Sequence, residues 1–350
     1  MNYSVMFSSA GVGETYLQDI GFKCVVANEL IKKRAEFHSH LQPDTHMVIG
    51  DINNDEVFDE FLEKSIDNKI DLLLATPPCQ GFSLSGKNKN LKQMIDDHRN
   101  FLIFKVFDAI DRIKPDYVLI ENVPRFLNMY FPYMGEVYRI IDLLKLLYSN
   151  KYIVENKILN SVNYGVPQNR KRVFIKLYKK SKKWDWPTEI PKIQTVRDAI
   201  SHLPSLESEE KSDIKWHFAR KHSKQHILWM KHTPTGESAF KNKVHYPKNK
   251  NGEKINGYHD SYARINWDKP APTITMRSDA ISSNSKVHPG RLNDDNTYSD
   301  ARVLSILELM ILSSLPEDWN IPDWATEILV RQVIGESVPP LVMKKIMEKI

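Results

Sequence analysis

The chain has 350 residues and a mass of 40.7 kDa, which is more than one hydrophobic core usually organises, so we expect two domains or one large domain with a substantial insertion. A composition of 41% hydrophobic and 27% charged residues excludes disordered, collagen-like and coiled-coil proteins. No stretch approaches the roughly 18 to 20 apolar residues of a membrane span. The N-terminal residues lack a secretory signal, and two cysteines, Cys24 and Cys79, build no disulfide framework. We therefore expect a soluble, cytoplasmic protein with no membrane partner.

The charge is unevenly distributed. Between Lys211 and Lys254 eleven Lys or Arg residues stand against three acidic ones, whereas the whole chain carries a formal charge of only +5. A concentrated basic segment favours a polyanionic partner. A solvated surface insertion is the alternative interpretation.

The first 180 residues alternate short apolar runs with segments of helical period, a pattern typical of a parallel sheet covered on both faces. The sequence therefore predicts a doubly wound, Rossmann-like α/β domain. The expected strands are 3–7, 23–27, 46–49, 70–75, 116–121, 152–159 and 172–178, and the expected helices are 14–20, 30–40, 54–66, 99–113 and a stripe over 137–147.

Beyond Tyr178 a linker-like stretch with two prolines follows, and periodicity stays poor to about Arg291. Helical patterning returns over 299–314, 324–334 and 341–350. We expect a catalytic and cofactor-binding domain over 1–188, completed by 328–350, and a smaller, irregular domain with a hinge over 189–327.

Three consecutive strands are followed by residues suited to a nucleotide-like cofactor. Gly11 and Gly13 follow the first strand, where glycine allows backbone amides to come close to a ligand. Glu29 ends the second strand and fits a ribose, and Asp51 ends the third and fits an adenine amino group. Taken singly, each acid is better explained as a solvated loop carboxylate.

The fourth and fifth strands lead to reactive side chains. Cys79 follows two prolines and precedes a glycine- and serine-rich stretch, which presents its thiol on a loop, whereas Cys24 lies in an apolar strand and is expected to be structural. Glu121 ends the fifth strand, and Arg170 and Arg172 are spaced to share one face of a strand. A thiol, a carboxyl group and two guanidiniums suit nucleophilic attack on an electron-poor ring.

Five blocks together resemble the C5-cytosine DNA methyltransferases in order and approximate spacing. They are Phe7–Gly11, Pro77–Gln80, Glu121–Val123, Gln168–Arg172 and Gly335–Pro340. The resemblance covers about residues 1–180 and 258–350. The basic segment between them has no counterpart, and it stands where that family carries its variable target-recognition region. It implies a DNA (cytosine-5-)-methyltransferase that uses S-adenosylmethionine and acts on a cytosine flipped out of double-stranded DNA.

The resemblance also implies roles for individual residues. Cys79 would add to C6 of cytosine, Glu121 would contact N3 and the amino group, and Arg172 would hold O2 beside Arg170. Phe7 would pack on the adenine of the cofactor, Glu29 would bind its ribose, and Asp51 with Ile52 would border the adenine. The expected cofactor-binding set is Phe7, Ser9, Ala10, Gly11, Glu29, Asp51, Ile52 and Pro78.

Contacts to DNA are expected from a lid over 81–99 and from the basic segment, by loops and not by a helix-turn-helix. A mobile surface loop without function is the alternative for 81–99. No metal is expected, because the histidines of the basic region are irregularly spaced and lack cysteine partners. The expected DNA-binding residues are Gln80, Ser83, Ser85, Lys87, Arg99, Lys241, Lys243, Lys248 and Lys250.

Four residues depart from the family pattern: Ser9, Val12, Leu307 and Glu336. They bring into question cofactor affinity and the packing of the terminal helix, but not the thiol chemistry.

The compact chain favours the modification enzyme of a restriction-modification system in a prokaryotic cytoplasm, acting on nucleoid DNA. We expect a monomer that forms no stable complex with a cognate restriction endonuclease. A tRNA cytosine-5 methyltransferase is the first alternative. A catalytically silent DNA-binding homologue is the second, and it predicts the loss of Cys79, Glu121 or Arg172, all of which are present.

Overall fold

The computed structural model describes residues 1–78, 101–255, 257, 260–283 and 287–350. These residues form two compact units: the first comprises 1–160, 171–188 and 343–350, and the second comprises 161–170 and 189–342. These are units of packing, and the functional domain boundaries stay a prediction. Within the described ranges, no helix has the length and apolar character needed to cross a membrane.

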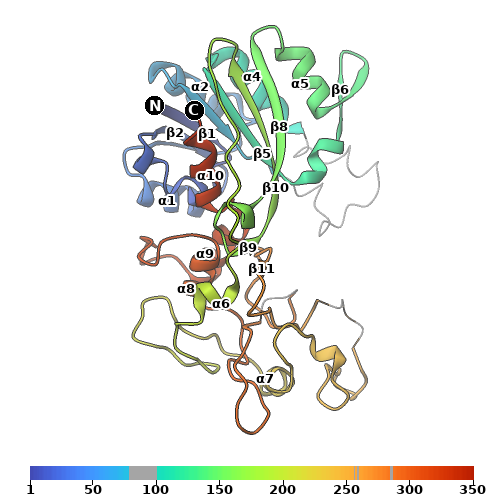
Figure 1. The fold of residues 1–350 in the computed structure, drawn as a ribbon. Coiled ribbons are helices and arrows are strands. Elements are labelled where there is room, and N and C mark those ends of the chain that lie inside the picture. Colours follow the sequence, from blue (N-terminus) through green and yellow to red (C-terminus); the bar gives the residue numbers. More distant parts are fainter. Residues whose placement is uncertain (79–100, 256, 258–259, 284–286) are drawn as a thin grey trace. The chain divides into compact units, whose positions relative to one another are not determined.

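The first unit is built on a seven-stranded sheet in the order β3-β2-β1-β4-β5-β10-β8 (Figure 1). Strand β10 runs antiparallel to both of its neighbours, and the other pairs are parallel. The predicted α/β fold is thereby confirmed. The strands span Asn2–Met6 (β1), Lys23–Glu29 (β2), His46–Ile49 (β3), Leu72–Ala75 (β4), Tyr117–Asn122 (β5), Tyr152–Asn160 (β8) and Lys171–Lys179 (β10).

Helices cover the two faces of this sheet. Met6, Val118 and Ile175 belong to one core cluster with apolar residues of α2 (Asp55–Asp67), α4 (Ile103–Ile113) and α5 (Ile140–Tyr148). Tyr117 points to the opposite face because strand side chains alternate. There its ring meets Trp184, whose indole Nε1 donates to the carbonyl of Ile346 at 3.0 Å. The opposite face is therefore packed in part by α10 (Pro340–Met347), and α1 (Lys32–Leu41) contacts β2 and β3.

Two predicted helices of the first unit are wrong in part. The predicted helix over 14–20 is replaced by two 3₁₀ turns, η1 (Val12–Glu14) and η2 (Gln18–Ile20). Gly11 and Gly21, with φ of 71° and 84°, limit the segment at its two ends, and the residues between them are too few to nucleate an α-helix. Val137 lies in a hairpin of β6 (Tyr130–Tyr133) and β7 (Glu136–Arg139). Positive φ at both central residues, Met134 and Gly135, gives the tight turn that joins these strands. A further 3₁₀ turn, η4, spans Pro124–Asn128.

The second unit contains little regular structure. Its described elements are η5 (Ser161–Tyr164), β9 (Gln168–Asn169), α6 (Val196–Ile200), α7 (Lys224–Lys231), η6 (Ala239–Lys241), β11 (Ala271–Pro272), α8 (Ile306–Leu312) and α9 (Glu327–Glu336). The helix predicted over 299–314 is shorter because Ser305 and Glu308 form a capping box that begins α8 at Ile306. Helix α7 was not predicted.

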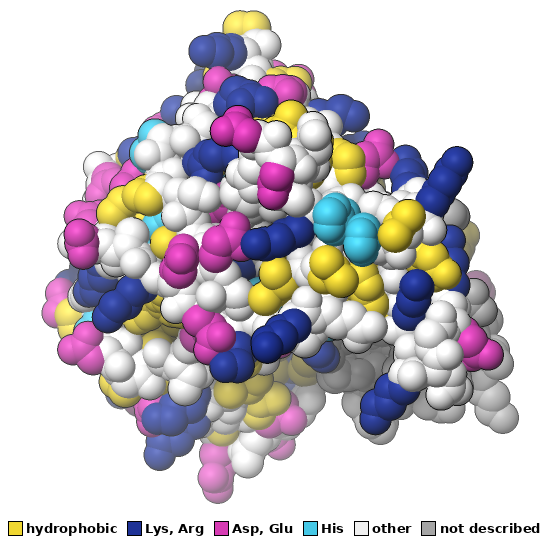
Figure 2. All heavy atoms as spheres, turned by 90° about the horizontal axis from the view of Figure 1, so that it is seen from below, with side chains coloured by type: hydrophobic (Ala, Val, Ile, Leu, Met, Phe, Trp, Pro, Cys, Tyr) yellow, Lys and Arg dark blue, Asp and Glu magenta, His cyan; other side chains and the backbone are white. Residues whose placement is uncertain are grey.

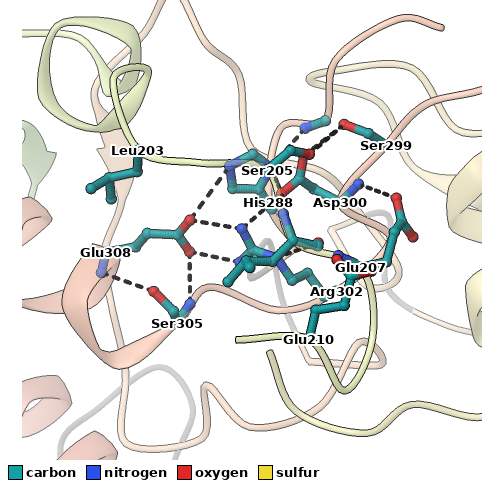
Figure 3. A network of polar contacts seen from close by, with 12 residues as sticks. Leu203, Ser205, Glu207, Glu210, His288, Ser299, Asp300, Arg302, Ser305 and Glu308 are labelled. Atoms are coloured by element: carbon teal, nitrogen blue, oxygen red, sulfur yellow. Dashed lines mark hydrogen bonds and ion pairs between the residues drawn. The ribbon is translucent and has the colours of Figure 1, made fainter. Parts of the chain in front are cut away.

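A buried network of charges lies in the second unit (Figure 3). Arg302 donates to both carboxylate oxygens of Glu308 at 2.8 and 2.9 Å and to Asp300 at 2.8 Å. His288 has one ring nitrogen 3.7 Å from Asp300 and the other 3.6 Å from Glu308. Burial raises the pKa of Glu308, but the charge of Arg302 outweighs it and holds the pKa well below its ordinary value.

Two buried histidines of this unit resist protonation. Burial is the main cause that lowers the pKa of His288 to about 3 and that of His222 to about 4. His222 Nε2 also accepts a hydrogen bond from the backbone amide of Val303 at 3.3 Å, which requires the neutral ring. Both side chains are therefore uncharged in the folded protein near neutral pH.

These shifts predict that the second unit loses stability on mild acidification. Between pH 6.5 and about pH 4 the unfolded chain takes up a proton at His222 that the folded chain refuses, so the free energy of unfolding falls with decreasing pH. The slope is about 1.4 kcal/mol per pH unit for each such histidine. Denaturant unfolding at several pH values, followed by tryptophan fluorescence, measures it. His222→Gln should flatten the slope, whereas the same change at exposed His202 should not; equal slopes for His222→Gln and the wild type would contradict the assignment.

Candidate active site

The turn that follows β1 has an unusual backbone. Phe7, Ser9 and Gly11 have φ values of 62°, 49° and 71°, so two non-glycine residues occupy the left-handed region. A bulky side chain is rarely found there, and such outliers cluster at functional sites. Phe7 is half-buried, and Ala10 is fully buried. The structure therefore concentrates backbone strain where the sequence predicts cofactor contacts.

Glu29 holds this turn in place. It lies at the end of β2, and its two carboxylate oxygens accept hydrogen bonds from the backbone amides of Ser9 and Ile31, both at 2.8 Å. The residue is only 6% exposed. A carboxylate offers about four acceptor sites, more than these two amides use, so the same group has capacity for hydroxyl donors.

The end of β3 adds one polar group to this edge. Asp51 is exposed, and its Oδ1 accepts a hydrogen bond from the amide of Asn53 at 2.9 Å. Ile52 is buried and packs in the core with Phe58 of α2. The predicted adenine contact of Ile52 therefore has little exposed side-chain surface to use.

The two residues that follow β4, directly before the predicted nucleophile, are hydrogen-bonded to neighbouring segments. Thr76 donates its backbone amide to Met6 O at 3.2 Å and its hydroxyl to Phe7 O at 2.8 Å. The carbonyl of Pro77 accepts from the side chain of Asn122 at 3.1 Å. The predicted cofactor residue Pro78 is half-buried. The predicted site residues Cys79, Gln80, Ser83, Ser85, Lys87 and Arg99, and the lid over 81–99, lie outside the described residues.

Glu121 and Arg172 come together at the end of β5. The antiparallel register pairs Glu121 with Phe174, which places Arg172 two residues along the same face. Arg172 Nε lies 3.0 Å from Glu121 Oε1, and the two side chains are only 17% and 12% exposed. Arg172 also donates to the carbonyl of Lys171 at 2.8 Å. A guanidinium has five N–H donors, more than these two contacts use.

Arg170 is not part of β10. The prediction assumed a continuous strand, but β9 ends at Asn169 and β10 begins at Lys171, so the alternation is broken at residue 170. Arg170 belongs to the second unit, is buried, and donates to the carbonyls of Ile274, Gly335 and Glu336 at 2.7, 3.1 and 2.7 Å. These contacts favour a positioning role for Arg170.

The same contacts explain part of the block Gly335–Pro340. A Cβ on Gly335 would lie 2.3 Å from the backbone carbon of Thr275, so only glycine fits there. Glu336 departs from the family pattern, yet it is its carbonyl that binds Arg170, so this contact does not depend on the identity of the side chain. Leu307, another departure, is buried in α8.

The predicted DNA-binding lysines of the basic segment are not equivalent. Lys241 forms an ion pair with Glu237 at 2.6 Å, and the Nζ atom of Lys248 lies 4.4 Å from the centre of the Tyr246 ring. Lys243 and Lys250 are exposed. On the face drawn in Figure 2, Lys and Arg side chains alternate with acidic, apolar and histidine side chains and form no continuous basic surface. Electrostatic contacts there would be local ones.

Comparisons with known proteins agree on one family. The family model described as C-5 cytosine-specific DNA methylase matches residues 1–350. The chain is 50% identical to the Type II methyltransferase M1.HgaI of Avibacterium volantium, with 99% of this chain and 96% of that protein covered. It is 28% identical to M1.HphI of Haemophilus parahaemolyticus, over 100% of this chain and 86% of that protein.

A similar fold is found in a solved structure. It is that of a proposed DNA modification methyltransferase encoded within an E. coli prophage, with a TM-score of 0.71 and 22% identity. The match covers 100% of this chain and 98% of that one. At this level of identity the similarity supports a shared fold and nothing further.

The strained turn predicts a stabilising substitution. At φ 49° a non-glycine residue costs about 1–2 kcal/mol, while glycine costs about 0.5–1 kcal/mol in chain entropy, so Ser9→Gly should raise the free energy of unfolding by about 0.5–1 kcal/mol. Denaturant unfolding of the two proteins measures the difference. Ser8→Gly is the matched control and should destabilise, because residue 8 is not in the left-handed region. A loss of stability in Ser9→Gly would show that the side chain contributes more than the backbone strain costs.

Proposed function

The chain belongs to the C-5 cytosine-specific DNA methylase family, and we propose that it methylates C5 of a cytosine flipped out of duplex DNA, with S-adenosylmethionine as the methyl donor. The observation that carries this proposal is the pairing of Glu121 with Arg172, at the end of the strand next to the one that leads into Cys79.

The residues at the ends of β1, β2 and β3 fit the proposed donor. Glu29 keeps acceptor capacity for ribose hydroxyls while it holds the amide of Ser9, and Asp51 presents an exposed carboxylate. Phe7, Ala10 and Gly11 shape the turn, and Pro78 would contribute from the segment that follows β4. When bound, S-adenosylmethionine supplies the methyl group that C5 receives.

The chemistry assigned to this chain's own residues begins at Cys79. Its thiolate adds to C6 of cytosine, which forms the sulfur–carbon bond and moves electron density onto C5. Glu121 stabilises the adduct by hydrogen bonding at N3 and the amino group, and Arg172 donates to O2. After C5 has gained the methyl group, loss of its proton restores the C5–C6 double bond and expels the thiolate.

Arg172 also orients Glu121, because its Nε contact fixes one carboxylate oxygen. We assign Arg170 to positioning, through the three carbonyls that it holds in the second unit.

Reaction at C6 requires the cytosine to leave the base stack, at a cost of a few kcal/mol. We propose that residues 1–188 with 328–350 carry out the chemistry and that 189–327 read the DNA. Lysines of the basic segment would contribute phosphate contacts, and the stretch 80–99 would contribute contacts around the flipped base.

The relative at 50% identity is named a Type II methyltransferase. We propose by analogy that the chain protects DNA against a cognate restriction endonuclease in a prokaryotic cytoplasm and acts as a monomer. The alternative of tRNA methylation is an outcome of the first experiment.

The first experiment measures transfer of labelled methyl groups from S-adenosylmethionine to plasmid DNA and to tRNA. We expect label in DNA at C5 of cytosine within one sequence context, no label in tRNA, and loss of activity to background in Cys79→Ser. A duplex that carries 5-fluorocytosine at the mapped target should become attached to the peptide containing residue 79, because fluorine blocks the final loss of the C5 proton. Label in tRNA alone, full activity of Cys79→Ser, or attachment at Cys24 would each contradict the proposal.

A second experiment tests the basic segment. Replacement of Lys241, Lys243, Lys248 and Lys250 by Gln should weaken DNA binding and reduce the slope of log K against log salt by about 0.9 for each lysine that contacts a phosphate. Gln at the exposed residues Lys69, Lys145, Lys151 and Lys183 of the first unit is the matched control for charge. If both quadruple variants change the slope equally, the basic segment is a solvated insertion.

A further inference from the structure

Three potential metal ligands meet inside the first unit. They are Glu14 at the end of η1, Cys24 in β2 and His38 in α1. One ligand atom from each lies within 4.8 Å of the other two. All three residues are buried, with 6%, 5% and 0% exposed. Carboxylate, thiol and imidazole from three separate elements therefore point to one small volume.

His38 lacks the hydrogen bonds that a buried imidazole normally makes. Neither of its ring nitrogens has a hydrogen-bond partner among the described residues. Nε2 lies 3.5 Å from Glu14 Oε2, which is too long for a good hydrogen bond. Buried polar atoms are nearly always satisfied, so this ring needs a partner.

The surrounding residues hold the three side chains in place. The Tyr3 hydroxyl donates to Glu14 Oε2 at 2.9 Å, and the Gln42 amide donates to the same oxygen at 3.4 Å. On the other side, a Cβ at Gly11 would come within 2.8 Å of His38 Cδ2. Hydrogen bonds that orient ligands in this way are typical of metal sites.

We propose that Glu14, Cys24 and His38 bind one Zn²⁺ ion, with water as the fourth ligand. Zinc accepts sulfur, nitrogen and carboxylate ligands in tetrahedral geometry, with bonds of about 2.0–2.3 Å. A thiolate and a carboxylate together neutralise the divalent ion, which makes burial of all these charges acceptable.

Binding exchanges one proton for the metal. The Cys24 thiol loses its proton to solvent as the sulfur–zinc bond forms, while His38 binds as the neutral ring and Glu14 as the carboxylate. Because the thiol must lose its proton to bind the metal, zinc affinity should increase with pH. The sequence predicted no metal, because the spacing of its histidines suggested none. These three ligands come from different elements and form no spacing motif.

The test purifies the full chain from cells grown with added zinc and measures its metal content by inductively coupled plasma mass spectrometry. We expect about one equivalent of zinc in the wild type and in His40→Gln, an exposed position on the same helix. Glu14→Gln and His38→Gln should lose it. Protein loaded with Co²⁺ in a Cys79→Ser background should show a thiolate-to-cobalt charge-transfer band, because Cys24 is then the only thiol.

The cobalt spectrum keeps the proposal testable if the buried variants fail to fold, because it uses the intact ligand set. Zinc well under one equivalent in the wild type, or retention of zinc in folded His38→Gln, would overturn the proposal. So would the absence of the charge-transfer band, because Cys24 would then not be a ligand.

Discussion

The irregular second unit depends on buried arginines that bind backbone carbonyls. A chain with few helices and strands leaves many carbonyl oxygens without ladder partners, and each one that is buried must be satisfied. Arg264 donates to the carbonyls of Met230, His288 and Ser299 at 3.0, 2.7 and 2.9 Å. Arg302, Arg331 and Arg170 act in the same way on other segments. Guanidinium groups thus do in this unit what hydrogen-bond ladders do in the first.

Such buried cations need compensating charge. Asp300 and Glu308 supply it around Arg302, and Glu327 supplies it for Arg331 at 2.8 Å. Removing one partner would leave a buried charge unpaired, at a cost of about 3–5 kcal/mol, so the network fixes one arrangement of the loops. A fixed loop framework is what recognition by loops requires, because a loop that is free to rearrange loses specificity for its ligand.

In the first unit the decisive constraint is the common edge of the parallel strands. Their carboxyl ends meet there, and Glu29 joins two of them by holding the amide of Ser9. The sequence was sufficient to predict the seven strands of the main sheet, their alternation with helices and the positions of Glu29, Asp51 and Glu121, because these follow from hydrophobic period and strand ends. Prediction failed where local backbone geometry decided: the glycine-bounded 3₁₀ turns after β1, the β6–β7 hairpin, and the break between β9 and β10 at residue 170.

The two cysteines illustrate the limit of sequence reasoning. Position alone distinguished them, since Cys79 follows a strand end and Cys24 lies within an apolar strand. That reasoning predicts the burial of Cys24 correctly. It cannot predict that Glu14 and His38 lie beside Cys24, because a contact among a 3₁₀ turn, a strand and a helix depends on tertiary packing and not on spacing along the chain. Burial alone would make Cys24 inert, whereas under the zinc proposal burial beside a carboxylate and an unsatisfied imidazole makes it a metal ligand. The chemistry of a thiol is therefore decided by its neighbours in space, and a sequence states only its neighbours in the chain.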